Sequence, residues 1–264
     1  MKKGRRLLMS HYVDLNSDLG ESFGNYTLGM DGEVLNHVTS ANVACGWHAG
    51  DPLIMDATVR MCKAKGVAIG AHPGYPDLMG FGRRAMAVNP AEAKAYMIYQ
   101  VGAIQAFCDS YGVTLQHMKL HGAFYNTACV TPALADAVLD GLQAVNPNIA
   151  AMVLSGSYIA KEAERRGIPV IQEVFADRGY TDEGTLVPRT EPGAFIKDPQ
   201  EALERVLMMV TEGKVVTNTG NTIDIVADSV CVHGDNPEAI AFTNYIREGL
   251  TKAGVTVANF QNRK

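Results

Sequence analysis

The stretch Ser40-Ala41-Asn42-Val43-Ala44-Cys45-Gly46-Trp47-His48-Ala49-Gly50-Asp51-Pro52 combines a strand, a turn and the start of a helix. Its small residues favour a buried strand that leads to His48. Asp51 is a favourable N-cap residue, and Pro52 suits the first position of a helix. Three further runs end in the same way, at His72, His121 and His233. Four such histidines, each within two residues of a glycine, predict one pocket at one end of a parallel sheet.

The composition is that of an ordinary globular protein. The chain has 264 residues, of which 47% are hydrophobic and 19% are charged, so it can bury one sizeable core. A net charge of −5 gives no electrostatic reason to expect a nucleic-acid partner. The 5 cysteines are odd in number and lack CxxC spacing, which argues against a disulfide framework or a zinc ribbon. This cysteine usage is typical of a reducing compartment.

Two features bear on the location of the protein. The apolar run after the basic residues of the N-terminus is broken at Ser10, so it is too short for a signal peptide, and residues 1–12 are interpreted as a frayed extension. No run approaches the length of a membrane span. We therefore expect a cytoplasmic protein without a membrane partner.

Predicted strands and helices alternate along the whole chain. The strands are expected at 13–21, 40–48, 67–72, 115–120, 150–154, 169–175 and 228–232, and the helices at 32–37, 52–65, 89–111, 131–145, 158–166, 199–212 and 237–253, with small extra elements at 223–226 and 255–260. Long irregular segments at 73–84 and 181–198 are of the kind that often carries function. Because no composition break marks a linker, residues 1–264 are expected to form a single α/β domain.

Polar side chains share one face of each predicted strand. The aligned residues are Asp14, Asn16, Asp18, Asn42, His48, His72, His117, Lys119, His121, Glu173, Asp177, Ser229, Cys231, His233 and Asp235. In a closed barrel one such face lines the lumen. Isolated buried charges cost several kcal/mol unless they are paired. We therefore expect these groups to pair around a polar site, which in parallel barrels lies at the carboxyl ends of the strands.

Each candidate residue also has a plainer interpretation. One strand-end histidine is usually a core residue bonded to the backbone, but four at matching positions argue that at least two take part in chemistry or binding. Asp18 lies nearer its strand end than Asp14 and is the better catalytic candidate, whereas Glu21 is assigned to a turn. Lys119 is either a lysine of depressed pKa or a ligand for an anion.

Arginines in the long segments are open to two interpretations as well. Arg83, Arg84 and Arg178 would suit a carboxylate or phosphate, or they are solvated loop charges. The chain has no phosphate-binding loop, dinucleotide fingerprint, nucleophile elbow or HExxH motif, so nothing predicts a nucleotide site. A divalent metal held by Asp18 and two strand-end histidines is geometrically feasible but is not specified by any motif.

Several multi-residue motifs together resemble those of the LamB/YcsF family. They are Asp14–Glu21, Ala41–Pro52, Gly70–Asp77, Gly80–Arg84, His121–Asn126, Phe175–Arg178 and Cys231–Asn236. The resemblance extends from Val13 to about Gly254. Departures are small, since Trp47 replaces an expected phenylalanine and Leu120 an expected proline, and neither removes a functional group.

The resemblance implies a fold and an activity. The implied fold is a TIM-like, seven-stranded β/α barrel similar to the glycoside hydrolase/deacetylase superfamily. The implied activity is that of a cyclic-amide hydrolase, the ATP-dependent opening of 5-oxoproline (pyroglutamate) to glutamate. In that family the chain works with two partners, subunits B and C, which are similar to the two parts of allophanate-hydrolase-like proteins. The missing phosphate loop agrees with ATP being used mainly at the partners.

The implied activity suggests roles for the candidate residues. Our hypothesis is that the partners phosphorylate the lactam oxygen and this chain then adds water. Asp18, with His48 or His72, would act as general base. His121, Lys119 or His233 would stabilise negative charge or protonate the ring nitrogen. Arg83 or Arg178 would hold the substrate carboxylate. The remaining substrate-binding candidates are Asn16, Asn42 and Asp177.

Two other functions remain open at this point. One is a metal-dependent deacetylase or amidohydrolase that acts on a small amide and needs no partner. The other is a non-catalytic subunit that binds a ligand within a hydrolase complex, in which the polar lumen only holds the ligand.

Overall fold

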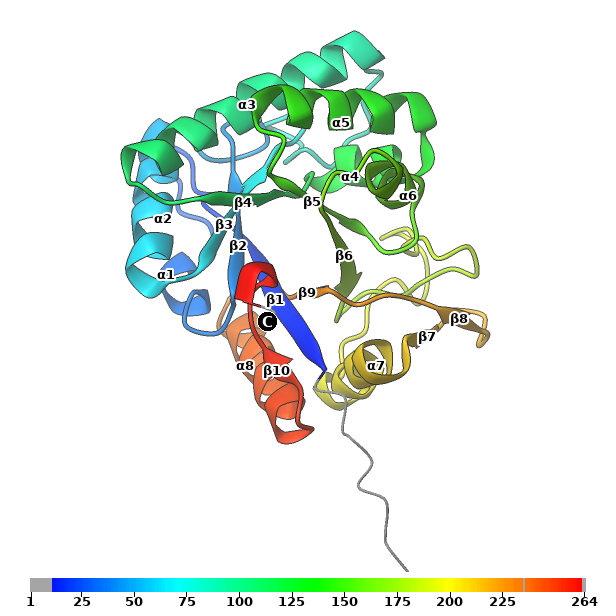
Figure 1. Ribbon diagram of the computed structural model, residues 1–264. Coiled ribbons are helices and arrows are strands. Elements are labelled where there is room, and N and C mark those ends of the chain that lie inside the picture. Colours follow the sequence, from blue (N-terminus) through cyan, green and yellow to red (C-terminus); the bar gives the residue numbers. More distant parts are fainter. Residues whose placement is uncertain (1–10, 235, 263–264) are drawn as a thin grey trace, which may run out of the picture.

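A closed parallel barrel forms the centre of the computed structural model, which describes residues 11–234 and 236–262. Its seven strands are β1 (Tyr12–Leu19), β2 (Ser40–Ala44), β3 (Ala68–His72), β4 (Leu115–Met118), β5 (Ala150–Leu154), β6 (Val170–Phe175) and β9 (Ser229–Cys231). Each strand pairs in parallel with the next, and β9 pairs with both β6 and β1, which closes the barrel (Figure 1). The predicted seven-stranded barrel is confirmed. Two parts of the prediction lie outside the described residues: residues 1–10 of the N-terminal extension, and Asp235.

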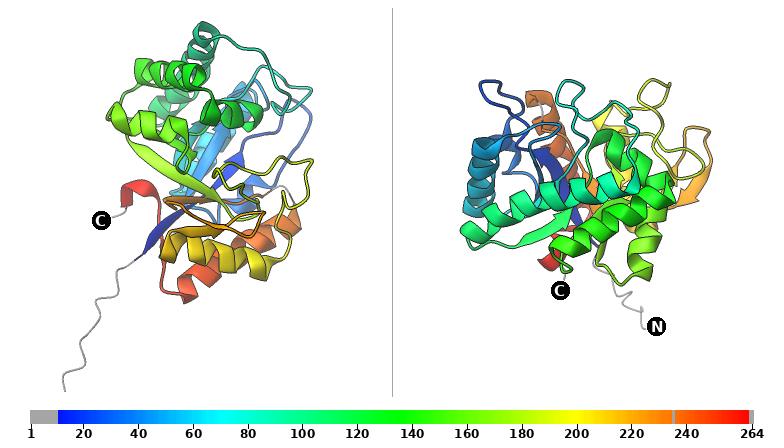
Figure 2. Two further views of the ribbon diagram at one scale, coloured as in Figure 1. Left: turned by 90° about the vertical axis from the view of Figure 1, so that its right-hand side faces the viewer. Right: turned by 90° about the horizontal axis from the view of Figure 1, so that it is seen from above.

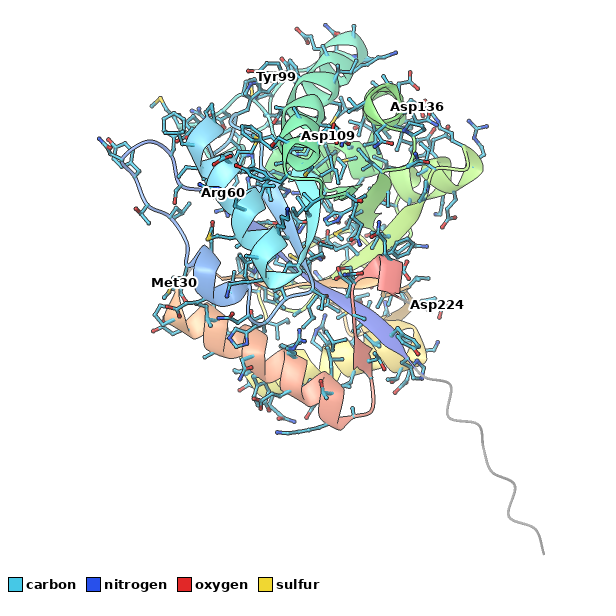
Figure 3. All side chains as sticks on the ribbon, turned by 60° about the vertical axis from the view of Figure 1, so that its left-hand side comes forward. Met30, Arg60, Tyr99, Asp109, Asp136 and Asp224 are labelled. Carbon is cyan, nitrogen blue, oxygen red and sulfur yellow. The ribbon has the colours of Figure 1, made fainter. Side chains whose placement is uncertain are left out.

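Helices surround the barrel, as the views in Figure 2 show. They are α1 (Asp31–Val34), α2 (Pro52–Lys65), α3 (Pro90–Ser110), α4 (Gly122–Val130), α5 (Pro132–Val145), α6 (Tyr158–Arg165), α7 (Pro199–Glu212) and α8 (Pro237–Lys252). The helices α3 and α5 pack against each other, as do α7 and α8. Charged side chains such as Arg60 and Asp109 project from the outer helical surface (Figure 3).

The lengths and compositions of the helices can be compared with those of a membrane span. Within residues 11–234 and 236–262, no single helix is long and apolar enough to cross a membrane. The pair α4 and α5 reaches that length and composition together, but the two helices meet at a bend of 115°.

The predicted helix boundaries follow from local capping. The Asp51 carboxylate accepts hydrogen bonds from the backbone amides of Leu53 and Ile54, which begins α2 directly after the turn that follows β2. Gly66 ends α2 with a left-handed φ of 67°, a conformation that glycine adopts without steric cost. The helix α3 begins with a capping box between Asn89 and Glu92.

Three elements differ from the prediction. The helix α4 was not predicted; it is short, it begins with a glycine, and no side chain caps its start at His121. The hairpin of β7 (Lys214–Val216) and β8 (Thr222–Asp224) was anticipated only as one short element. The predicted edge piece is present as β10 (Thr256–Val257), which pairs in parallel with β1 and is followed by a short 3-10 turn at Phe260–Asn262.

The barrel lumen is polar, as the alternation of residues along the strands predicts. At its amino-terminal end, the Asp14 carboxylate accepts hydrogen bonds from the hydroxyls of Ser40 and Ser229. One layer higher, the Asn16 amide donates to the Ser229 hydroxyl at 2.8 Å. The opposite faces of the strands carry apolar side chains such as Leu15, which is fully buried in the core beneath the helices. These buried polar side chains, Asp14, Asn16 and the two serines, therefore satisfy one another inside the barrel.

Gly70 on β3 leaves room for the ring of His117 on β4. A Cβ atom at Gly70 would lie 2.1 Å from His117 Nε2, so Gly70→Ala is expected to destabilise the protein by about 3 kcal/mol, the upper part of the usual range for overpacking. In the matched control Gly102→Ala, the added methyl meets no atom within 4 Å and lies inside α3. This control should stabilise by about 0.5–1 kcal/mol. Urea unfolding of both variants measures the difference, and equal shifts would refute the steric account.

Candidate active site

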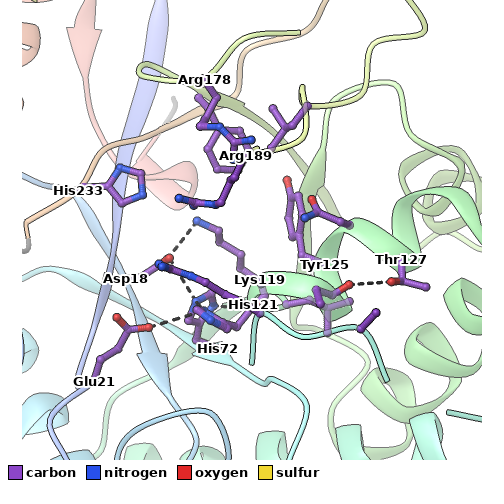
Figure 4. A pocket seen from close by; sticks show the side chains of 18 residues that line it. Asp18, Glu21, His72, Lys119, His121, Tyr125, Thr127, Arg178, Arg189 and His233 are labelled. Atoms are coloured by element: carbon purple, nitrogen blue, oxygen red, sulfur yellow. Dashed lines mark hydrogen bonds and ion pairs between the residues drawn. The ribbon is translucent and has the colours of Figure 1, made fainter. Parts of the chain in front are cut away.

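A cavity of about 240 Å³ opens at the carboxyl ends of the barrel strands (Figure 4). Its ionisable lining residues include Asp18, Glu21, His72, Arg83, Lys119, His121, Tyr125, Arg178, Arg189 and His233. Drug-sized ligands usually occupy pockets of about 300–1,000 Å³, so this cavity suits a smaller molecule. It lies where the pattern of strand-end residues predicted a pocket.

The ammonium group of Lys119 lies at the centre of the cavity floor. Its Nζ lies 2.8 Å from Glu173 Oε1, 3.1 Å from Asp18 Oδ1 and 3.1 Å from Asn16 Oδ1. Burial disfavours the charged form, but the nearby negative charges of groups such as Asp18 and Glu173 hold the pKa of Lys119 well above its usual range. The alternative of a lysine with depressed pKa is therefore wrong, and Lys119 is a cation.

The Asp18 carboxylate pairs with this cation and lines the cavity. Its side chain keeps 21% of its surface exposed, and its Oδ1 also accepts a hydrogen bond from the Asn42 amide at 2.9 Å. Although burial acts in the opposite direction, the charges of His72 and Lys119 hold the pKa of Asp18 well below its usual range. Asp18 is thus an ionised acceptor at neutral pH.

Three of the predicted histidines meet beside Asp18. His72 Nε2 lies 3.3 Å from Asp18 Oδ2 and 3.0 Å from His121 Nδ1. The rings of His48 and His121 stack in parallel with 3.7 Å between their centroids. Burial lowers the pKa of His121 to about 3 and holds the pKa of His48 well below its usual range, so both imidazoles are neutral at pH 7.

Glu21 completes this cluster, although the sequence assigned it to a turn. Its Oε1 lies 3.1 Å from His48 Nε2 and 3.6 Å from His121 Nδ1. Alternation along β1 would place Glu21 on the face opposite Asp18. Gly20, with a left-handed φ of 70°, breaks that alternation and lets both carboxylates reach the same cavity. The four residues Glu21, His48, His72 and His121 bring ligand atoms within 4.8 Å of one another and could hold a metal ion.

The opposite side of the cavity is lined by arginines and His233 (Figure 4). His233 Nδ1 lies 2.9 Å from Asp177 Oδ2, so these two predicted residues form a pair away from the other histidines. The guanidinium of Arg178 donates to the carbonyl oxygens of Ala194 and Val187. Its hydrogen-bonding capacity is therefore largely used by the backbone.

Arg83 and Arg189 are the two other arginines that line the cavity. Arg83 lies over the ring of Phe81, whereas the predicted alternative Arg84 pairs with Asp77 on the loop and does not line the cavity. Arg189 was not predicted, because it lies in the irregular segment after β6, where no strand alternation indicates which way a side chain points.

Asn16 and Asn42 lie beneath the cavity, not on its wall. Both are fully buried, and the Asn42 amide donates to Asn16 Oδ1 at 2.8 Å. His117 Nε2 lies 2.7 Å from the Asn42 side-chain oxygen. Neither residue lines the cavity, and both contact residues that do, Asp18 and Lys119.

The sequence is similar throughout to a known family and to named relatives. Residues 13–264 match the model of the LamB/YcsF family. A Fusobacterium nucleatum protein that is named as the A subunit of 5-oxoprolinase is 60% identical over 249 residues, which cover 94% of this chain and 97% of the relative. A Pyrococcus horikoshii protein of the same name is 54% identical over 245 residues, with coverages of 93% and 96%.

Solved structures agree with this relationship. A lactam utilization protein from Thermus thermophilus superposes with a TM-score of 0.89 at 45% identity, covering 94% of this chain and 100% of that one. A putative cellobiose-phosphate cleavage protein from Enterococcus faecalis gives a TM-score of 0.54 at 14% identity, over 96% and 98% of the two chains. The second similarity extends to the fold alone.

Proposed function

Because this chain belongs to the LamB/YcsF family, we propose that it is the subunit that opens the ring in an ATP-dependent 5-oxoprolinase. The names of its relatives support the substrate and the reaction. The observation that carries the proposal is the ionised Asp18, held by the buried Lys119, on the wall of a cavity that suits a small molecule.

The proposed chemistry begins outside this chain. A five-membered lactam is a resonance-stabilised amide, and transfer of a phosphoryl group from ATP to its oxygen makes the ring carbon electrophilic. Water adds to that carbon, and the carbon–nitrogen bond breaks as the ring nitrogen takes up a proton. The resulting acyl phosphate reacts with a second water molecule and releases glutamate and phosphate.

Residues on the cavity wall can be assigned to these steps. Asp18 accepts a proton from the attacking water, and its fixed position beside Lys119 orients that water. His233 is the candidate that protonates the ring nitrogen, because the one proton of the neutral His121 ring is donated to the Phe81 carbonyl oxygen. Lys119 stabilises charge on the oxygen bound to the carbon that water attacks. Arg83 and Arg189 are the candidates for the substrate carboxylate, since Arg178 is engaged by backbone carbonyls.

We assign ATP binding to the two partner subunits, B and C. A cavity of about 240 Å³ is small for a nucleoside triphosphate together with a lactam, and the sequence has no phosphate-binding loop. We also propose a cytoplasmic location, which the five free, buried cysteines favour.

The proposal is tested by reconstitution. The purified chain is mixed with the two candidate partner subunits, ATP and 5-oxoproline, and glutamate is measured. Glutamate should form only when all three proteins and ATP are present. If the partners alone release glutamate at the full rate, this chain is a non-catalytic subunit; if the complete mixture releases none, the proposed reaction is wrong.

The Glu21 and histidine cluster favours a second candidate function. A site of this composition could serve a metal-dependent deacetylase or amidohydrolase that acts alone on a small amide. This function requires hydrolysis of N-acetylated or cyclic amides by the isolated chain, lost on chelation and restored by added metal.

A further inference from the structure

The backbone fixes the protons of two histidines in the cluster. His72 Nδ1 lies 2.7 Å from the carbonyl oxygen of Lys119, and His121 Nε2 lies 2.8 Å from the carbonyl oxygen of Phe81. A carbonyl oxygen only accepts, so each of these nitrogens must carry the proton. In the neutral form of each ring the other nitrogen, His72 Nε2 or His121 Nδ1, is therefore a lone pair.

These two lone pairs point at each other. The nitrogens His72 Nε2 and His121 Nδ1 are 3.0 Å apart, a hydrogen-bond distance at which two neutral rings would share no hydrogen, so either a proton or a metal ion must lie between them. The adjacent atoms are also electron-rich, since Glu21 Oε1 lies 3.6 Å from His121 Nδ1 and Asp18 Oδ2 lies 3.3 Å from His72 Nε2. Such a convergence of acceptors requires a positive charge among them.

His48 also has an unusual environment in this cluster. Its Nε2 lies 3.1 Å from Glu21 Oε1, while its Nδ1 is buried and has no hydrogen-bond partner. The ring is fully buried and packs flat against His121. In the tautomer that carries its proton on Nδ1, His48 offers the lone pair of Nε2 to the same cluster.

We propose that Glu21, His48, His72 and His121 bind one divalent transition-metal ion of the zinc class. Zinc takes nitrogen ligands at about 2.0–2.1 Å, which puts tetrahedral ligands roughly 3.3 Å apart. The neighbouring ligand atoms of the cluster are 3.0 Å, 3.1 Å and 3.6 Å apart. Binding to both stacked rings requires them to tilt towards the ion.

The surroundings of the histidines are those of metal ligands. His72 and His121 each donate their outer N–H to a backbone carbonyl, an arrangement that fixes the ring orientation of histidine ligands in metalloproteins. A set of three imidazoles and one carboxylate suits zinc, iron, cobalt and nickel better than magnesium or calcium. Because Glu21, His72 and His121 also line the cavity, the ion would face a bound substrate. Bound zinc lowers the pKa of its water to about 7.

The experiment uses the full-length chain without an affinity tag. The protein is stripped with a chelator, titrated with Co²⁺ and followed by visible absorption, and separate samples are loaded with Zn²⁺, desalted and analysed for metal. One ion per chain and the intense bands of low-coordinate cobalt are expected. His72→Ala and His121→Ala should weaken binding by at least about 100-fold, since even loss of an outer partner costs about 10–100-fold.

His233→Gln is the matched control, since this histidine lines the same cavity but pairs with Asp177. It should bind metal as the wild type does. Circular dichroism checks that each variant is folded. If a histidine variant does not fold, Glu21→Gln is measured in its place. Wild-type protein that retains no metal after desalting would overturn the inference and assign the positive charge to a proton shared by His72 and His121. Unchanged affinity in the cluster variants would overturn it as well.

The metal site and the proposed ring opening can fail separately. Glutamate release by a complex whose wild-type chain binds no metal would leave the proposed function intact and remove the metal site. Stoichiometric metal in a chain whose complete complex releases no glutamate would do the reverse.

Discussion

Asp18→Asn should reduce 5-oxoproline-dependent glutamate release by the three-subunit complex by about 10³-fold, because general-base catalysis typically contributes about 10²–10⁴-fold. The amide keeps the shape of the side chain and its hydrogen-bonding capacity towards Asn42 and Lys119, but it cannot take a proton from water. The expected loss is therefore in kcat, with a smaller change in KM. Glutamate is measured over time at saturating 5-oxoproline and ATP.

The control for this prediction is Asp224→Asn. Asp224 is exposed on β8 and pairs with Lys214, away from the cavity residues, so the same chemical change should leave glutamate release unchanged. Activity of Asp18→Asn close to that of Asp224→Asn would remove Asp18 from the reaction. Urea unfolding of both variants separates a catalytic loss from an unfolded chain.

Lys119→Met should destabilise the folded chain by about 3–5 kcal/mol, the range for removing one partner of a buried ion pair. Only 3% of the Lys119 side chain is exposed and none of that of Glu173, so the variant leaves an uncompensated carboxylate in the barrel. Methionine keeps much of the volume of lysine, which limits the contribution of a cavity. The free energy of unfolding is measured in urea at pH 7.

The double variant Lys119→Met with Glu173→Gln tests the electrostatic cause. Glutamine still accepts the hydrogen bond that the Tyr125 hydroxyl donates to Glu173 Oε2, and it removes the unpaired charge. At least half of the lost stability should return. A double variant as unstable as the sum of the two single variants would show that charge pairing is not the origin of the effect.

Alternation along strands predicted much of this site from sequence. It placed Asn16 and Asp18 on the lumen side of β1, and Lys119 on the same side as it follows β4, because side chains in a strand point alternately to opposite faces. It also led to His72 and His121, which lie at or just after strand ends. The rule requires extended backbone, so it predicted side-chain directions correctly where a strand continues to the barrel mouth.

The residues that were missed lie where this rule does not apply. Gly20 turns the chain before Glu21, and the irregular segment that contains Arg189 folds back over the barrel mouth. The sequence placed Glu173 on the lumen face but did not mark it as a site residue. Its role depends on its ion pair with Lys119, which reaches it from the end of β4. Which partner a lumen charge meets depends on strand register and tilt, and a single sequence does not encode these in any short pattern.

The pairing of β1 with β9 has a consequence for how the protein is made. The two strands pair at Asp14 and Ser229, so the last barrel strand to be synthesised supplies the second barrel neighbour of the first. A chain still emerging from the ribosome would therefore carry an open sheet edge, which is prone to pair with other chains, until β9 has left the exit tunnel. The histidines of the cluster are all translated well before that moment, so nascent chains would hold them in an unsealed sheet, open to water and to premature contacts.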